Sequence, residues 1–139
     1  MQTNVFLRDM NLDGIRSSDG RRLEVVANGL PTYHGAQLAI DATIVSPVTA
    51  LGQPVGSASE QDGVALRVAS RRKRTTYPEL LSSRRCHLLV AAVEIGGRWD
   101  DEAYRFLLEL AKAKARSAPS VLRSSLVGAW LRRWTGVIA

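Results

Sequence analysis

One stretch of the chain constrains the fold more than any other, because it is almost continuously apolar over the length of a single strand. Residues 86–95 read CHLLVAAVEI and are followed directly by Gly96-Gly97. An apolar run of this length, without polar alternation, is typical of a strand that is covered on both faces. The sequence therefore predicts a sheet with this strand at its centre and helices on its faces, which is an α/β or α+β fold.

Two further strands are predicted before this run. Residues 21–27 (RRLEVVA) alternate, and the turn signal Asn28-Gly29 follows them. Residues 37–45 (QLAIDATIV) alternate more clearly, with a period of two. Asp41 is the exception within this mostly apolar strand, and a purely structural aspartate there would need buried hydrogen-bond partners.

Helical spacing marks three later segments. Residues 64–76 have a basic outer face, and Pro78 ends the pattern. Another helix is expected after Asp100 and Asp101, which supply acidic residues at its start. A last amphipathic helix is expected over about residues 119–134. The predicted fold is a central mixed β-sheet flanked by helices.

Length and composition predict a single compact domain. The chain has 139 residues, of which 45% are hydrophobic, enough for one core. Residues 1–20 are rich in turn-forming residues and are expected to be poorly anchored, so the domain is predicted over residues 21–139, with a long loop at 46–63. The single cysteine excludes an internal disulfide and multi-cysteine zinc sites. We expect an intracellular protein, because neither a membrane span nor a secretory signal is recognisable.

The charge balance makes a polyanion the first partner to consider. Nineteen Lys and Arg stand against thirteen Asp and Glu, which gives a net charge of +6. Part of this charge lies on the helix over residues 64–76, and its candidate nucleic-acid-binding residues are Arg67, Arg71, Arg72 and Arg74. A second basic stretch runs from Lys112 to the end of the chain without any carboxylate. The alternative for both stretches is a solvated helix face.

Three residues could carry metal-dependent chemistry. If the strands that contain Glu24 and Asp41 are neighbours, the two carboxylates can bind a divalent cation through hard oxygen ligands, as Mg²⁺ prefers. Lys73, on the following basic helix, would stabilise the negative charge that develops on a scissile phosphate. Taken singly, Glu24 on an edge strand and Lys73 on a helix surface could equally be solvent-exposed.

The order of these features resembles a known nuclease domain. An acid in one strand and an acid in the next are followed by a basic helix running into KRTTYPEL, and then by an apolar strand that closes in Gly-Gly-Arg-Trp. This arrangement is similar to the restriction-endonuclease-like domain at the C-terminal end of polyproteins from early-branching non-long-terminal-repeat retrotransposons. That domain is a variant of the PD-(D/E)XK nuclease fold.

Each motif of that family has a counterpart here. Arg22-Leu23-Glu24 is similar to its Arg-Pro-Asp signature, and Ile40-Asp41-Ala42-Thr43 to the strand that holds its second acid. The stretch from Lys73 to Tyr77 resembles the helical motif Lys-x-x-Lys-Tyr, although it has Thr76 in the place of the second lysine.

The resemblance implies a DNA endonuclease domain, dependent on Mg²⁺ or Mn²⁺, that nicks target DNA. Glu24 and Asp41 would hold the metal, Lys73 would act at the phosphate and Tyr77 would support the site. The partners would be DNA and upstream reverse-transcriptase domains of the parent polyprotein, with no membrane, and the location would be nuclear if chromosomal DNA is the target. Two alternatives remain open. One is a catalytically inactive nucleic-acid-binding remnant, and the other is a structural fragment that docks on missing reverse-transcriptase domains.

Overall fold

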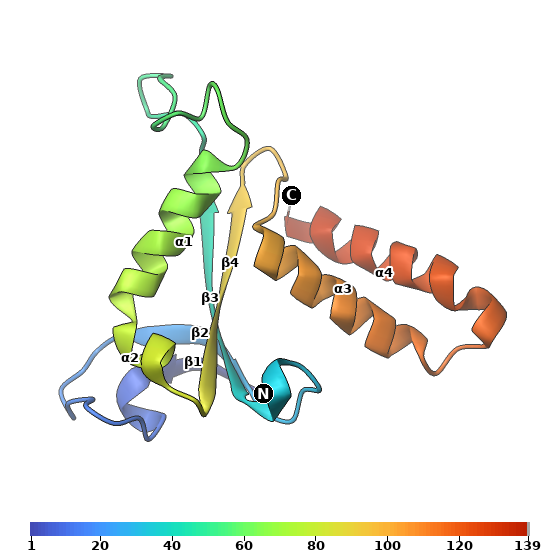
Figure 1. Cartoon of the computed structure of the whole chain (residues 1–139), viewed down its shortest axis with the longest axis horizontal. Helices are drawn as coiled ribbons and strands as arrows, with labels where there is room; N and C mark the ends of the chain where they lie inside the picture. Colours follow the sequence, from blue (N-terminus) through green and yellow to red (C-terminus); the bar gives the residue numbers. More distant parts are fainter. Residues whose placement is uncertain (139) are drawn as a thin grey trace. The chain divides into compact units, whose positions relative to one another are not determined.

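A computed structural model describes the backbone of residues 1–138 and the side chains as far as residue 136. Four strands form one sheet in the order β1-β2-β3-β4 (Figure 1). They are β1 (Gln2–Phe6), β2 (Arg22–Ala27), β3 (Gln37–Val45) and β4 (Cys86–Glu94). β2 runs antiparallel to both β1 and β3. β4 runs parallel to β3, because Gln37 N–H donates to Arg85 O at their starts and Ile95 N–H donates to Val45 O at their ends. The prediction of an α+β chain with a mixed sheet is confirmed.

Four α-helices and three short 3-10 turns complete the described chain. The helices are α1 (Val64–Thr76), α2 (Pro78–Ser82), α3 (Asp101–Ala115) and α4 (Arg123–Ile138), and the turns are η1 (Leu7–Asp9), η2 (Tyr33–Gly35) and η3 (Ser120–Leu122). β3 and α1 have the predicted bounds. The predicted loop over residues 46–63 contains no helix or strand, and one isolated bridge joins Val48 to Pro54 within it. No helix in the described chain is long and apolar enough to cross a membrane.

The chain divides into two compact units. The first comprises Met1–Thr43 and Val68–Ala91, and the second comprises Ile44–Arg67 and the chain from Ala92 onward. The sequence predicts a single domain over residues 21–139, and this remains a prediction. The four candidate catalytic residues all belong to the first unit.

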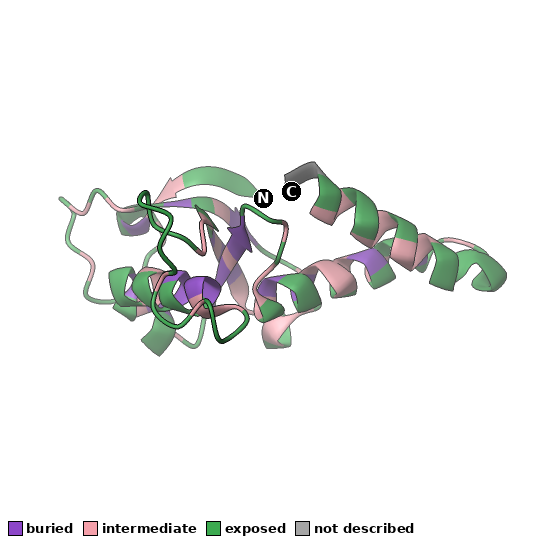
Figure 2. Ribbon diagram, turned by 90° about the horizontal axis from the view of Figure 1, so that it is seen from above, coloured by how far each residue is buried: buried purple, intermediate pink, exposed green. Residues whose placement is uncertain are grey.

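Leucine and valine side chains from three strands and a short helix form the core of the first unit (Figure 2). The largest fully buried side chains are Leu7, Leu23, Val26, Leu38, Leu80, Leu88, Leu89 and Val90. Burying side chains of this size removes apolar surface from water and contributes most of the favourable free energy of folding. This core gives the candidate site a rigid support.

The N-terminal segment differs from its prediction. The sequence predicts that residues 1–20 are poorly anchored, but β1 pairs with β2 in a register that sets Val5 opposite Leu23. Leu7 is completely buried, and its N–H donates to Arg21 O at 2.9 Å. The apolar residues of this segment are too few to show a period of two, so local patterning could not reveal the strand.

The position of β4 also differs from its prediction. The sequence predicts a central strand, but the order β1-β2-β3-β4 places β4 at one edge of the sheet. Seven of its nine residues are nevertheless buried. A continuous apolar run therefore indicated burial correctly, but burial on both faces does not determine how many strand neighbours a segment has.

The second unit contains the helical hairpin of α3 and α4. The side chain of Asp100 accepts hydrogen bonds from the N–H groups of Glu102 and Ala103, and it caps α3 as the acidic residues at its start predicted. The last helix begins at Arg123 rather than near Pro119, because η3 occupies the first turn after the proline. α4 packs along α3, which gives its apolar stripe a partner within the chain.

Candidate active site

The two candidate carboxylates lie next to each other across β2 and β3. The register pairs Val25 with Ile40, so the next pair along the ladder sets Glu24 opposite Asp41. The Glu24 carboxylate accepts a hydrogen bond from Ala42 N–H, and the carboxyl groups of Glu24 and Asp41 are in hydrogen-bonding contact. β2 and β3 are neighbours in the sheet, and this pairing brings the two acids together.

α1 directs Lys73 toward the same carboxylates. Ala69 and Ser70 are buried, and Lys73 lies four and three residues after them, which puts it on the same side of the helix. Its Nζ lies 3.0 Å from Oδ2 of Asp41. The side chain of Asp41 is 3% exposed and that of Lys73 is 30% exposed. The pair is therefore buried on the carboxylate side and open to water on the lysine side.

Tyr77 joins the cluster from the end of α1. It is buried, and its hydroxyl donates to Arg22 O at 2.8 Å, so it fixes the backbone of β2 two residues before Glu24. Burial and the nearby negative charge of Asp41 raise the pKa of Tyr77 to about 12. The phenol is therefore neutral at physiological pH and acts as a hydrogen-bond donor.

The charge of Glu24 is disfavoured where it lies. Glu24 is exposed as a residue, but its carboxylate lies against β3, and this partial loss of hydration raises its pKa above the ordinary glutamate value. The contact with Asp41 raises the pKa further, whereas the Ala42 N–H and Lys73 lower it. Glu24 and Asp41 share the single positive charge of Lys73, so a second positive charge beside them would stabilise both carboxylates.

Glu24→Gln is expected to change how the free energy of unfolding depends on pH. The folded protein holds the Glu24 proton more tightly than the unfolded chain, so this stabilisation is present below the ordinary glutamate pKa of 4.5. It is lost as pH rises through the raised pKa of the folded state. Glutamine has no proton to lose, so the variant should lose less stability over that interval.

Urea denaturation between about pH 4 and pH 8 measures this difference. Glu60→Gln is the matched control, because Glu60 is exposed in the 46–63 loop. A parallel fall in stability for the wild type and Glu24→Gln would contradict the prediction.

The donor set at this cluster fits a hard divalent cation. Among the described residues, no group of three or more His, Cys, Asp and Glu side chains could hold a metal ion. Mg²⁺ needs fewer protein ligands, because it binds one or two carboxylates and completes its shell with water and phosphate oxygens. Oδ2 of Asp41 is buried and lies 3.0 Å from the Lys73 ammonium, so a metal ion bound there would compete with Lys73 for this oxygen. Glu24 and Asp41 are the residues that could hold Mg²⁺ or Mn²⁺.

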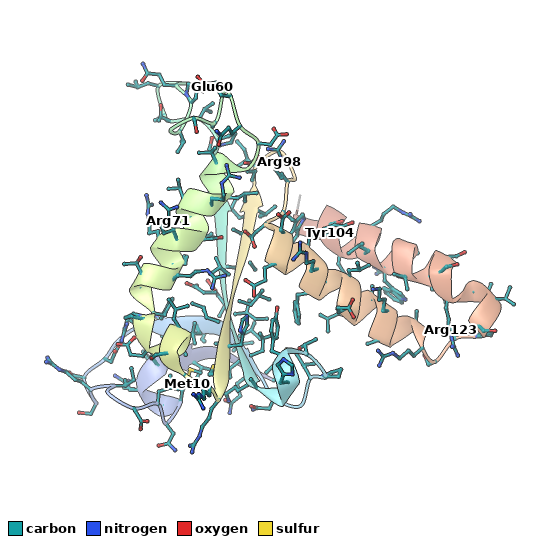
Figure 3. The ribbon with its side chains drawn as sticks, in the orientation of Figure 1. Met10, Glu60, Arg71, Arg98, Tyr104 and Arg123 are labelled. Carbon is teal, nitrogen blue, oxygen red and sulfur yellow. The ribbon has the colours of Figure 1, made fainter. Side chains whose placement is uncertain are left out.

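The four candidate arginines differ in their surroundings. Arg71, labelled in Figure 3, and its neighbour Arg72 are exposed on α1, and both line a shallow depression of about 410 Å³. Arg74, on the same helix, is half-buried. Arg67 belongs to the second unit, where its Nη1 donates to Asp62 O at 2.9 Å. Arg71 and Arg72 are thus the candidates whose guanidinium groups are best presented to an anion.

Arg21, which no sequence motif identified, links the elements that surround the site. The guanidinium of Arg21 lies 2.7 Å from Asp19 and 2.8 Å from Glu79, and it also donates to Thr76 O at the end of α1. These bonds hold the pKa of Glu79 below its usual range. Residues 21 and 79 are far apart in sequence, so no local motif could have revealed this link between β2 and the start of α2.

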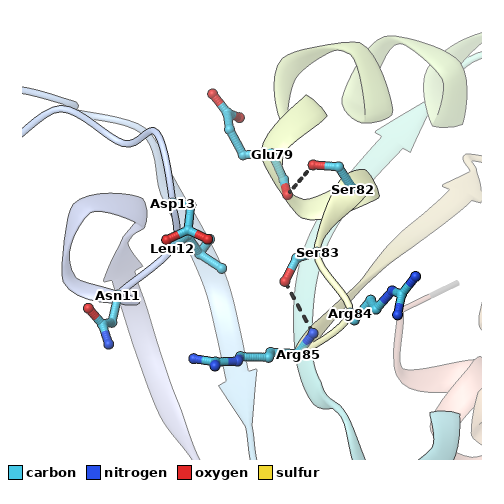
Figure 4. A pocket seen from close by; sticks show the side chains of 8 residues that line it. All are labelled: Asn11, Leu12, Asp13, Glu79, Ser82, Ser83, Arg84 and Arg85. Carbon is cyan, nitrogen blue, oxygen red and sulfur yellow. Dashed lines mark hydrogen bonds between the residues drawn. The ribbon is translucent and has the colours of Figure 1, made fainter.

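Two other features of the first unit do not add chemistry to the site. A polar cavity of about 310 Å³ is lined by two acidic and two basic residues (Figure 4), and its serine hydroxyls already bond to Glu79 O and Arg85 N–H. Cys86 is buried, and burial raises the pKa of its thiol to about 11, so the thiolate needed for metal binding or nucleophilic attack is not populated.

Comparison with known proteins identifies no relative of this chain. No family model, no curated protein and no solved structure matches it.

Proposed function

We propose that the chain is a retroelement-derived DNA endonuclease domain of the restriction-endonuclease-like PD-(D/E)XK type, which uses a divalent metal ion to nick target DNA. One observation carries the proposal. Glu24 from β2, Asp41 from β3 and Lys73 from α1 meet in one cluster, with Lys73 Nζ 3.0 Å from Asp41 Oδ2. Two acids can hold a divalent metal ion, and a lysine can stabilise negative charge on a phosphate, so the cluster has the parts for metal-assisted phosphodiester hydrolysis.

The carboxylates and the lysine would have different tasks. Glu24 and Asp41 would hold Mg²⁺ or Mn²⁺, which supplies a nucleophile at neutral pH and polarises the scissile phosphate. Lys73 is 30% exposed, so its ammonium can reach a phosphate at the surface while it stays near Asp41. A fixed positive charge there stabilises the negative charge that builds up on the phosphate oxygens in the transition state.

Tyr77 and the arginines would act around this centre. Tyr77 is a positioning residue, because its hydroxyl holds the Arg22 carbonyl and thereby the part of β2 that carries Glu24. Arg71 and Arg72 would contact the DNA backbone, with Arg67 and Arg74 as further candidates. Phosphate contacts of this kind contribute affinity that falls steeply with salt and carry little sequence information.

The alternative is a nucleic-acid-binding module of the same fold that has lost catalysis. Lys73 already neutralises Asp41, and the described residues offer two carboxylates rather than a larger ligand cluster. The motifs also differ from the family pattern at Leu23 and Thr76. In this case the basic surface of α1 would bind DNA without cleaving it.

Cleavage of supercoiled plasmid in the presence of Mg²⁺ or Mn²⁺ tests the proposal. The wild type is compared with Asp41→Asn and with Asp13→Asn, a control that removes the same charge from an exposed position. We expect nicked circles with the wild type and with the control, and none with Asp41→Asn. If the wild type binds DNA in a salt-sensitive way but does not nick it, the inactive nucleic-acid-binding module is supported. If Asp41→Asn nicks DNA as fast as the wild type, the cluster of Glu24, Asp41 and Lys73 is not the catalytic site.

A further inference from the structure

The helical hairpin of the second unit has a concentration of positive charge that the proposed nuclease site does not use. The sequence contains no Asp or Glu after Glu109. Six basic residues follow on α3, on the turn after it and on α4, and all six are exposed. We call these residues the hairpin cations: Lys112, Lys114, Arg116, Arg123, Arg132 and Arg133.

Two hairpin cations gather around one tryptophan. Lys114 Nζ lies 4.1 Å from the centroid of the Trp130 ring, and the Cζ of Arg133 lies 5.8 Å from the same centroid. Cation–π attraction favours each contact, but it also holds two like charges near one ring. Such an arrangement is stabilised when an anion lies between or beside the cations.

Arg132 adds to this charge from the next position on α4. Gly128 lies one turn before it, and the Arg132 guanidinium passes so close to this glycine that an added Cβ would lie 3.3 Å from Nη1. The Arg132 side chain therefore runs back along α4 past Gly128 and remains exposed.

The apolar side of α4 is directed to its partner helix. Trp130 and Trp134 are half-buried, with ring centroids 5.8 Å apart, and α4 packs along α3. A helix that lies on a lipid surface needs a free apolar face, whereas the large apolar side chains described on α4 are half-buried and its cations are exposed. The chemistry therefore favours a hydrophilic polyanion over a membrane.

We propose that the hairpin cations form a second nucleic-acid-binding surface, which binds the phosphate backbone of duplex DNA independently of the Glu24, Asp41 and Lys73 cluster. The surface would bind through charge, because Lys and Arg that neutralise phosphates release condensed counterions. It needs no metal ion and no catalytic residue. It would operate whether the chain cleaves DNA or only binds it.

Fluorescence anisotropy with a labelled duplex, measured over a range of salt concentrations without divalent metal, tests this surface. Lys114→Gln/Arg133→Gln removes the cations around Trp130, and Arg116→Gln/Arg132→Gln leaves that cluster intact if the first variant fails to fold. Arg8→Gln/Arg16→Gln is the control, because it removes the same charge from exposed residues of the first unit.

Each hairpin variant should weaken binding by about tenfold or more and reduce the slope of log K against log salt by about 2, because each phosphate contact contributes about 0.9. The control should change the slope by much less. Equal effects of the hairpin and control variants would overturn the proposal, since net charge alone would then explain binding. Tighter binding of the wild type to phosphatidylserine vesicles than to the duplex would also overturn it.

Discussion

Lys73→Met is expected to lower the free energy of unfolding by about 2 to 3 kcal/mol at neutral pH. The substitution leaves the carboxylate of Asp41 buried without its ion-pair partner and next to Glu24. Removing one partner of a fully buried pair costs about 3–5 kcal/mol. The expected loss is smaller because the lysine end of this pair is partly open to water. Methionine keeps the length and apolar character of the lysine stem, so packing changes little.

Asp41→Asn should cost clearly less than Lys73→Met. The ammonium group left behind is on the more exposed side of the pair and can be hydrated. Asparagine also removes the repulsion between Asp41 and Glu24. Urea denaturation of both variants at neutral pH measures the asymmetry. Equal losses of unfolding free energy in Lys73→Met and Asp41→Asn would mean that groups around the pair, rather than the attraction between Asp41 and Lys73, stabilise the two charges.

The local patterns predicted some elements residue by residue. β3 follows from the alternation around Asp41, and α1 ends at Thr76 because Tyr77 precedes a proline. The two acids could be brought together only on the condition that their strands are neighbours, as β2 and β3 are. Lys73 and Tyr77 followed from their place in a motif, and both lie at the cluster.

Local sequence patterns did not predict which distant segments pair with or contact each other. The pairing of β1 with β2 and the edge position of β4 depend on which segments meet, and a period of two does not encode that choice. The bond of Arg21 to Glu79 joins residues separated by 58 positions. Arg67 and Arg71 are four residues apart on one helix, yet they belong to different compact units.

The second large effect is expected in the same variant: Lys73→Met should slow DNA nicking without weakening metal binding. The rate of plasmid nicking should fall by about 10²–10³, the usual loss when one fixed donor to a developing negative charge is removed. The affinity for Mn²⁺, measured by calorimetry, should not fall, because Nζ competes with the metal ion for Asp41.

Lys73→Arg serves as the matched variant for that measurement. Arginine keeps the positive charge but replaces a compact ammonium with a planar guanidinium, so it should restore part of the rate. Glu24→Gln should show the opposite pattern to Lys73→Met, with weakened Mn²⁺ binding, because it removes a ligand rather than a competitor. If Lys73→Met lost Mn²⁺ binding and nicking together, Lys73 would be supporting the geometry of Asp41 and would have no direct role at the phosphate.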